Sequence, residues 1–333
     1  MQYAPFGLSG LAVSRLSLGA MDFPLAMSEG DAQRVVDEAI DHGVNLIDTA
    51  DSYGDSQKVL GKLLPAEKRE QVFLATKVHK QRCRQKSAAR CSRVNILDSI
   101  HRSLRELDTD YVDLFQLHHP DPDTPIDETL QTLDDLVKSG KTRYVGLSNH
   151  FAWHVALTLN EARRLGLARP ISLQANYNLV NRQPELEVRS MLERLGVGYM
   201  VYGPLARGLL AGKFHDENGK LHDGIEDAAA KMSIQTAGDP EQVSALVRAI
   251  RRIAEEQGLS PAQLSILWIL SRPWVSTVLL GGSKPERFTH LYEVADRELP
   301  EDVVEQLDER SDFRRPPTYF NKSFTLGPGL PVM

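Results

Sequence analysis

The 333-residue sequence has only two cysteines, Cys83 and Cys91, with seven residues between them. This spacing matches neither a disulfide framework nor a zinc knuckle, so the sequence predicts two free thiols in a reducing compartment. Residues 1–10 lack the positively charged start and the apolar core of a secretory signal. We therefore expect a cytoplasmic protein.

Two other absences exclude whole classes of partner. No window of the sequence approaches 18 uninterrupted apolar residues, so we expect no membrane span. The formal net charge is −6 and the pI is near 6.0, which leaves no basic stripe of the kind that a nucleic-acid backbone requires. Neither a membrane nor a nucleic acid is therefore an expected partner, and the sequence leaves the oligomeric state open.

Short apolar runs recur along the chain and alternate with helical patterns. This alternation predicts parallel strands joined by right-handed helical crossovers, and hence an α/β fold of the (β/α)8 barrel type. A β-hairpin is expected over residues 2–15, ahead of the barrel. The eight expected strands are residues 16–20, 45–48, 72–76, 111–117, 142–147, 171–175, 197–202 and 275–280.

The helical patterns carry recognisable start signals. Ser28 and Asp31 form an expected capping pair before the first helix, and Thr124 is expected to cap a later helix with Pro125 in its first turn. Residues 240–257 and 260–270 predict two extra helices before the last strand.

No linker rich in proline or serine divides the chain, so we expect a single domain over residues 1–333. The interval 203–239 is too long for a simple barrel connection and is expected to be a functional loop. The tail 313–333 is expected either to fold over the barrel mouth or to be loose.

Four side chains able to carry chemistry lie at or shortly after the ends of the apolar runs: Asp48, Tyr53, Lys77 and His118. In a (β/α)8 barrel the carboxyl ends of the strands gather on one face, where the active site lies. A neighbouring ammonium group lowers the pKa of a phenol, so we expect Lys77 to lower that of Tyr53 from about 10. Asp48 would hold Lys77 charged and oriented. His118 would donate a hydrogen bond to a substrate oxygen as negative charge develops there.

These residues lie in segments that resemble the aldo-keto reductase family, and the branch of bacterial and potassium-channel β-subunit-like members most closely. The resemblance covers nearly the whole chain and implies a barrel that transfers hydride between NADP(H) and a carbonyl or alcohol. It assigns the catalytic tetrad to Asp48, Tyr53, Lys77 and His118, with Tyr53 as general acid. The matching segments are Leu18-Gly19-Ala20-Met21, Ile47 to Gly54, Asp113 to His118, Gly146-Leu147-Ser148-Asn149, Pro204 to Leu210 and Leu280-Gly281-Gly282-Ser283.

The same resemblance implies the cofactor contacts. Ser148, Asn149 and Gln174 would hold the nicotinamide amide, and Tyr202 would stack on the ring. The remaining implied contacts are Met21, Leu205 and Lys213, with Gly281, Ser283, Lys284 and Arg287 around the adenosine 2′-phosphate.

The sequence departs from the family pattern at three positions. His290 and Leu291 stand where the family usually has Glu and Asn to hold the adenine amine, and Gly203 replaces a common Ser. These departures leave the preference for NADPH over NADH open.

Three alternatives to a reductase can be stated. Adjacent His118 and His119 suggest a metal site, but neighbours on a strand point to opposite faces and no third ligand is evident, so no metal is expected. Lys77 could form a Schiff base in a lyase. The chain could also be an NADP(H)-binding regulatory subunit with little turnover, as the resemblance to potassium-channel β-subunits implies.

Overall fold

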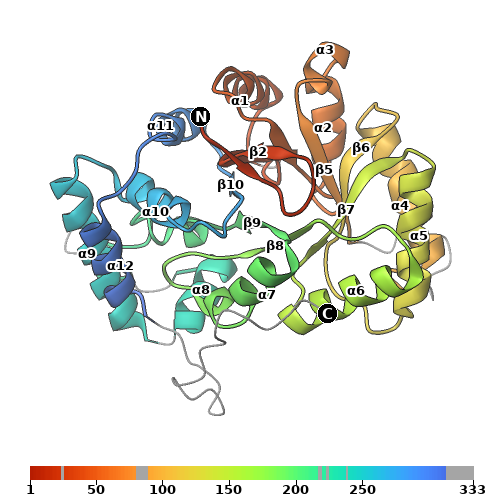
Figure 1. The fold of residues 1–333 in the computed structure, drawn as a ribbon. Coiled ribbons are helices and arrows are strands. Elements are labelled where there is room, and N and C mark those ends of the chain that lie inside the picture. Colours follow the sequence, from red (N-terminus) through yellow and green to blue (C-terminus); the bar gives the residue numbers. More distant parts are fainter. Residues whose placement is uncertain (24–25, 80–88, 217–219, 223–224, 238, 313–333) are drawn as a thin grey trace.

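Eight parallel strands close into a barrel in the order β10-β3-β4-β5-β6-β7-β8-β9. The computed structural model describes residues 1–23, 26–79, 89–216, 220–222, 225–237 and 239–312 (Figure 1). The (β/α)8 prediction is confirmed, and each strand boundary lies within two residues of the expected one. The strands are β3 (Leu16–Gly19), β4 (Leu46–Asp48), β5 (Phe73–Val78), β6 (Val112–Leu117), β7 (Thr142–Ser148), β8 (Ser172–Asn176), β9 (Gly198–Tyr202) and β10 (Thr277–Leu280).

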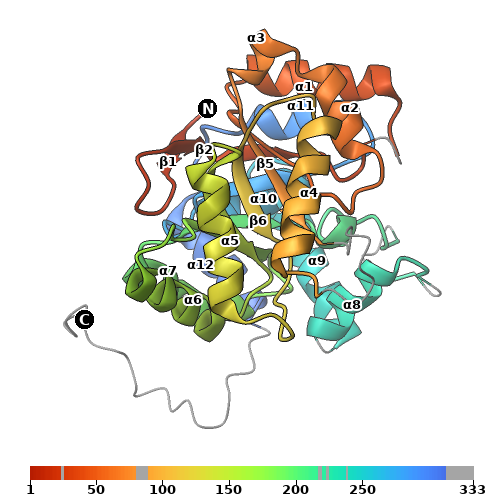
Figure 2. The same ribbon diagram turned by 90° about the vertical axis from the view of Figure 1, so that its right-hand side faces the viewer.

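Helices surround this barrel, as the two perpendicular views show (Figures 1 and 2). Their apolar faces pack onto the outward-facing side chains of the strands and form one large core. The helices are α1 (Glu29–Asp41), α2 (Ser56–Leu63), α3 (Ala66–Arg69), α4 (Arg93–Glu106), α5 (Ile126–Lys138), α6 (Ala152–Leu165), α7 (Val188–Leu195), α8 (Ala228–Ala237), α9 (Pro240–Glu256), α10 (Pro261–Leu270), α11 (Glu286–Tyr292) and α12 (Glu301–Arg310).

The predicted helix starts are right in one case and wrong in another. Ser28 accepts a hydrogen bond from the backbone of Asp31 and caps α1 as expected. The expected Thr124 cap is wrong, because α5 begins at Ile126 after Pro125. The Thr124 hydroxyl instead donates to the Asp121 carboxylate at 2.9 Å.

The expected hairpin is present as β1 (Tyr3–Pro5) and β2 (Ala12–Ser14), paired antiparallel. Phe6 and Val13 are buried in a second apolar cluster together with inward-facing strand residues such as Leu46 and Leu114. The Phe6 ring also meets Phe73, at the start of β5, edge to face. The hairpin therefore closes the amino-terminal end of the barrel, and the carboxyl-terminal end is left for the polar strand ends.

Between β9 and α9 the chain is more regular than a long loop. It contains a short 3-10 helix, η2 (Ala206–Gly208), and the helix α8. A second 3-10 helix, η1 (Gln183–Glu185), precedes α7. The tail 313–333 and residues 80–88, which include Cys83, lie outside the described residues.

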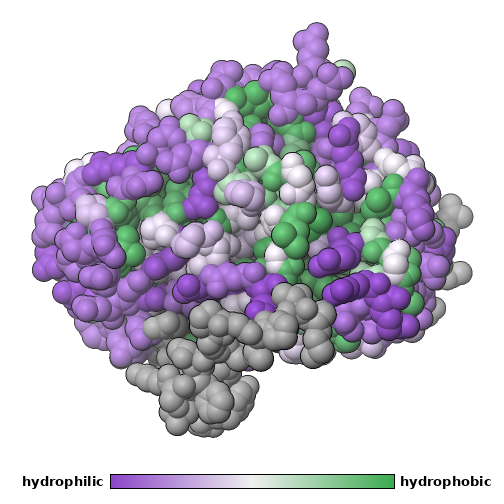
Figure 3. Space-filling view, viewed as in Figure 1, coloured by the Kyte–Doolittle hydropathy of each residue, from purple (hydrophilic) through white to green (hydrophobic). Residues whose placement is uncertain are grey.

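The surface seen in the first view is mostly hydrophilic over the outer helices, with smaller hydrophobic areas toward its middle (Figure 3). Among the described residues, no helix combines the length and the apolar character needed to cross a membrane.

Candidate active site

A buried ion pair lies at the carboxyl-terminal end of the barrel. Lys77, on β5, is fully buried, and its ammonium group donates to Oδ2 of Asp48, the last residue of β4. A second donation reaches the carbonyl oxygen of Thr49 at 2.8 Å. Burial opposes the charge of Lys77, but Asp48 and Tyr53 outweigh it and hold the Lys77 pKa above its ordinary value. The lysine is therefore a fixed cation.

Tyr53 and His118 complete a compact group of four with this ion pair. The Lys77 nitrogen lies 4.9 Å from the centroid of the Tyr53 ring. The Tyr53 and His118 rings meet edge to face, with their centroids 5.7 Å apart. Strand ends β4, β5 and β6 and the turn before α2 thus bring together the four residues that the sequence singled out.

The expectation for the Tyr53 pKa is wrong in sign. Burial raises the pKa of this phenol above 10, and the opposing effect of Lys77 only partly offsets it, while Asp48 raises it further. Proximity to an ammonium group alone does not decide the shift, because burial of the phenol has a larger effect on its pKa than Lys77 does. Tyr53 therefore holds its proton across the physiological range.

His118 is neutral. Burial lowers its pKa to about 2, and the nearby charge of Lys77 acts in the same direction. A neutral imidazole has one N–H donor and one acceptor nitrogen. His118 is thus able to donate one hydrogen bond without adding charge to the site.

Gln116 belongs to this group and was missed in the sequence. It is fully buried on β6, and its amide donates to Oδ1 of Asp48 at 3.1 Å. Gln174, on β8, donates to the same oxygen at 2.9 Å. One signal was available, because Gln116 is a polar residue between the apolar residues Phe115 and Leu117 near the end of a strand. A Cβ on Gly146 would lie 3.2 Å from the Gln116 side chain, so this glycine leaves room for it.

The residues expected to hold the nicotinamide lie beside the tetrad. Ser148 ends β7, and Asn149 follows it with a positive φ of 60°. The Asn149 amide donates to the carbonyl oxygen of His118 at 3.0 Å, and its oxygen accepts from the Tyr202 hydroxyl at 2.8 Å. Tyr202 ends β9 and is partly exposed. The expected amide-binding and stacking residues are thus joined to the tetrad by hydrogen bonds.

The other expected cofactor residues lie in the segments that follow β3, β9 and β10. Met21 is 40% exposed. Leu205 directly precedes η2, and exposed Lys213 lies beyond it. Gly281 follows β10 and is exposed.

Exposed Lys284 and Arg287 flank the start of α11, close to Ser283. Within the described part of the chain, neither of these two cations forms an ion pair. A phosphate monoester is bound by hydroxyl and cationic side chains, so Ser283, Lys284 and Arg287 fit a 2′-phosphate.

The two residues that depart from the family pattern have other roles here. His290 contacts the Ser260 hydroxyl at 2.9 Å, and its carbonyl oxygen accepts from Gln263. Leu291 is buried and belongs to the main core. His290 therefore joins α11 to the capped start of α10, and Leu291 packs the helix onto the barrel.

Gly203 has a physical reason to be glycine. Its φ is +63°, and a Cβ would come within 2.5 Å of the Asn176 side-chain nitrogen. A serine at this position would be both strained and crowded.

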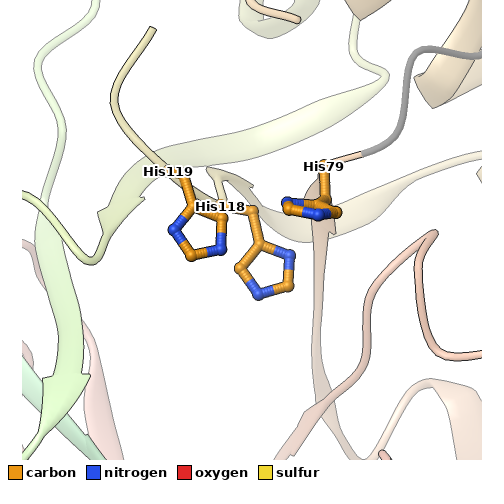
Figure 4. A group of neighbouring side chains, drawn as sticks. All are labelled: His79, His118 and His119. Atoms are coloured by element: carbon orange, nitrogen blue, oxygen red, sulfur yellow. The ribbon is translucent and has the colours of Figure 1, made fainter.

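Three histidines gather at the edge of the tetrad (Figure 4). The His118 and His119 rings are stacked, with centroids 4.8 Å apart and only 7° between their planes. The expectation that they point to opposite faces is wrong, because β6 ends at Leu117 and both residues lie beyond the strand. His79, one residue past β5, is a third imidazole whose centroid is 4.9 Å from each of the other two.

A hollow of ≈ 630 Å³ lies at the opposite end of the barrel, between the hairpin and the strand starts. Phe73, Arg143 and Tyr144 are among its lining residues. It contains none of the tetrad. Chemistry in (β/α)8 barrels is carried by the carboxyl ends of the strands, so we assign the candidate site to the tetrad end.

Comparison with known proteins agrees with this geometry. The model of the Aldo/keto reductase family matches residues 15–312. The chain belongs to the aldo/keto reductase family. This family consists of oxidoreductases that generally use NAD(P)H, and the match spans every strand of the barrel.

Several similar members cover almost the whole chain. The uncharacterized oxidoreductase YrpG of Bacillus subtilis is 30% identical over 321 residues, covering 93% of this chain and 95% of its own. A putative voltage-gated potassium channel subunit beta of Schizosaccharomyces pombe is 32% identical over 323 residues, with 92% of each chain covered. Protein tas of Escherichia coli is 32% identical over 339 residues, covering 92% of this chain and 97% of its own.

Proposed function

We propose that this aldo/keto reductase transfers hydride between NADP(H) and an aldehyde or ketone, with Tyr53 as the general acid. The observation that carries the proposal is the protonated phenol held beside the buried Lys77–Asp48 pair. Such a phenol is placed to give its proton to an oxygen on which negative charge develops. Hydride transfer from a nicotinamide creates that charge on a carbonyl oxygen.

Each residue of the tetrad has a distinct task in this proposal. Lys77 supplies the positive charge that stabilises Tyr53 as it becomes a phenolate during proton donation. Asp48 holds the ammonium group in place, so that no reorganisation is needed when the proton leaves. Neutral His118 donates a hydrogen bond to the same substrate oxygen. The same group also serves the reverse reaction, in which an alcohol is oxidised.

The cofactor supplies the hydride, and the chain offers groups to hold it. Ser148, Asn149 and Gln174 would bind the nicotinamide amide, and Tyr202 would pack on the ring. The preference for a 2′-phosphate rests on Lys284 and Arg287, two cations that form no ion pair with any described residue. We also propose a reducing compartment, the cytoplasm, since buried Cys91 is a free thiol.

The deciding experiment is the substitution Tyr53→Phe, measured as NADPH oxidation against a panel of aldehydes, keto-sugars and quinones. We expect kcat to fall by about 10²- to 10⁴-fold, the range that general acids contribute. NADPH affinity, measured by fluorescence titration, should not change. Tyr144→Phe is the control, because this phenol lies at the start of β7, far from the site. Normal kcat in Tyr53→Phe would refute the proposal.

A regulatory subunit is the second candidate, because one relative carries the name of a potassium channel subunit beta. This candidate predicts stable NADPH binding without turnover of any carbonyl in the panel. The reductase predicts both binding and turnover. A Schiff-base lyase fits less well, because Schiff-base formation needs a neutral amine, whereas Asp48 and Tyr53 keep Lys77 charged. Borohydride trapping of a substrate adduct on Lys77 would favour the lyase.

A further inference from the structure

The imidazoles of His79, His118 and His119 offer three nitrogen ligands at one point of the barrel mouth. One ring nitrogen from each lies within 4.8 Å of the others. The nitrogen ligands of a tetrahedral Zn²⁺ ion lie about 3.4 Å apart, since each Zn–N bond is about 2.1 Å. Small side-chain rotations would therefore bring all three onto one ion. From this geometry we propose that these histidines form a binding site for a divalent transition-metal ion such as Zn²⁺ or Co²⁺.

The backbone around these ligands is already held in place. The His79 amide donates to Oδ1 of Asp51 at 3.0 Å, and the His118 amide donates to the carbonyl oxygen of Val78 at 3.1 Å. The His118 carbonyl oxygen accepts from Asn149 at 3.0 Å. Only side-chain torsions need to change when an ion binds, so the cost of ordering the site is small.

Three imidazole nitrogens are suitable ligands for Zn²⁺ and similar transition-metal ions. Three histidines with a free fourth position are a known arrangement for Zn²⁺, in which a water or a substrate atom completes the tetrahedron. Nδ1 of His118 is buried and has no hydrogen-bond partner within the described part of the chain. An ion would give this orphaned nitrogen a partner.

The charges around the site limit its affinity. Lys77 lies close enough to His118, and Arg90 to His119, to disfavour added positive charge. Asp51, which holds the His79 backbone, acts in the opposite direction. We therefore expect reversible binding that a chelator removes, and no role for the ion in stabilising the fold.

Such an ion would occupy the place where the substrate oxygen is expected. His118 cannot both bind the ion and donate its hydrogen bond to a carbonyl, and the His118 and Tyr53 rings are in contact. Resting on the proposed function, this predicts inhibition by Zn²⁺ in which the carbonyl KM rises and kcat is unchanged. EDTA should restore the original KM.

Direct binding tests the site without relying on turnover. Co²⁺ is titrated into the full-length protein, free of any affinity tag, and visible absorption is recorded, which is far stronger for four-coordinate than for six-coordinate Co²⁺. The variants His79→Asn and His119→Asn remove one ligand each and leave the tetrad intact. We expect each to weaken Co²⁺ binding by more than about tenfold. His101→Asn, an exposed histidine on α4, should bind Co²⁺ as the parent protein does.

Circular dichroism first establishes that the variants are folded. The Co²⁺ spectra then show whether the three histidines bind the ion. Intense absorption that both variants lose supports the site. Absorption no stronger than that of aqueous Co²⁺, or a strong band that survives in both variants, overturns it. If the metal binds as expected and no carbonyl is ever reduced, the reductase proposal fails while the metal site stands.

Discussion

Gln174 donates its side-chain amide to Oδ1 of Asp48, while Lys77 binds Oδ2 of the same carboxylate. Gln116 shares Oδ1 with Gln174, so the carboxylate is held from both sides inside the barrel. The orientation of the Lys77 ammonium group depends on this arrangement. Gln116 is in register with Gly146, two residues before Ser148, whereas Gln174 is in register with Ser148 and is itself an expected nicotinamide contact. The two glutamines are therefore expected to differ in function.

The first prediction compares Gln116→Met with Gln174→Met. Losing a hydrogen bond to a charged group costs about 1.5–3 kcal/mol, so we expect kcat to fall by about tenfold or more in both variants. NADPH affinity should weaken only in Gln174→Met. Steady-state kinetics and fluorescence titration measure the two effects, with Gln33→Met on α1 as control. Equal loss of cofactor affinity in both variants would contradict this division of roles.

The second prediction concerns the two cations at the start of α11. Replacing Lys284 or Arg287 with Gln removes a charge from the proposed 2′-phosphate site. We expect the KM for NADPH to rise by about 10- to 100-fold, the equivalent of one charge-assisted contact, while the KM for NADH stays the same. Arg105→Gln, at the end of α4, is the control. If the KM for NADH rises equally, these residues serve binding in general and do not select the phosphate.

The arrangement of the strands could be predicted because each apolar run contains a single strand and the helical patterns between the runs enforce parallel neighbours. The grouping of Asp48, Lys77 and His118 follows from that topology alone. Side-chain directions beyond a strand end could not be predicted. The stacking of His118 on His119 depends on the backbone leaving β6 at Leu117, which no periodicity reveals.

Electrostatic shifts also lay beyond the sequence. The sign of the Tyr53 pKa shift depends on how far burial outweighs Lys77, and burial is known only once the barrel has closed. Gln116 was missed for a similar reason, because only the closed barrel brings its side chain, on β6, to the Asp48 carboxylate on β4.

The third prediction separates two causes of strain at Gly203. Gly203→Ser adds a Cβ at positive φ and also crowds Asn176. At Gly140 φ is +73° but no atom lies within 4 Å of a Cβ, and Gly10 has open space at an ordinary φ. We expect the free energy of unfolding to fall by about 1 kcal/mol for Gly140→Ser and by about 2–3 kcal/mol for Gly203→Ser. Gly10→Ser should change it little. Urea denaturation gives all three values, and equal losses at Gly203 and Gly140 would rule out the clash.

The fourth prediction concerns acid stability and His215. This side chain is only 6% exposed, and within the described residues neither of its ring nitrogens has a hydrogen-bond partner. Burial and the neighbouring Arg251 lower its pKa to about 4, from an ordinary value of 6.5. Between these two values the unfolded chain binds a proton that the folded chain does not. The free energy of unfolding must therefore decrease as the pH falls from 6.5 to 4.

The variant His215→Phe removes this proton-binding difference and keeps a ring of similar shape. Between pH 7.5 and pH 5 we expect the parent protein to lose more stability than the variant, by on the order of 1 kcal/mol. Urea midpoints at the two pH values measure the difference. His101→Phe replaces an exposed histidine and should follow the parent, since its ring is in water in both states. If His215→Phe and the parent lose stability equally, His215 is charged in the folded protein, and a counter-charge must compensate for its burial.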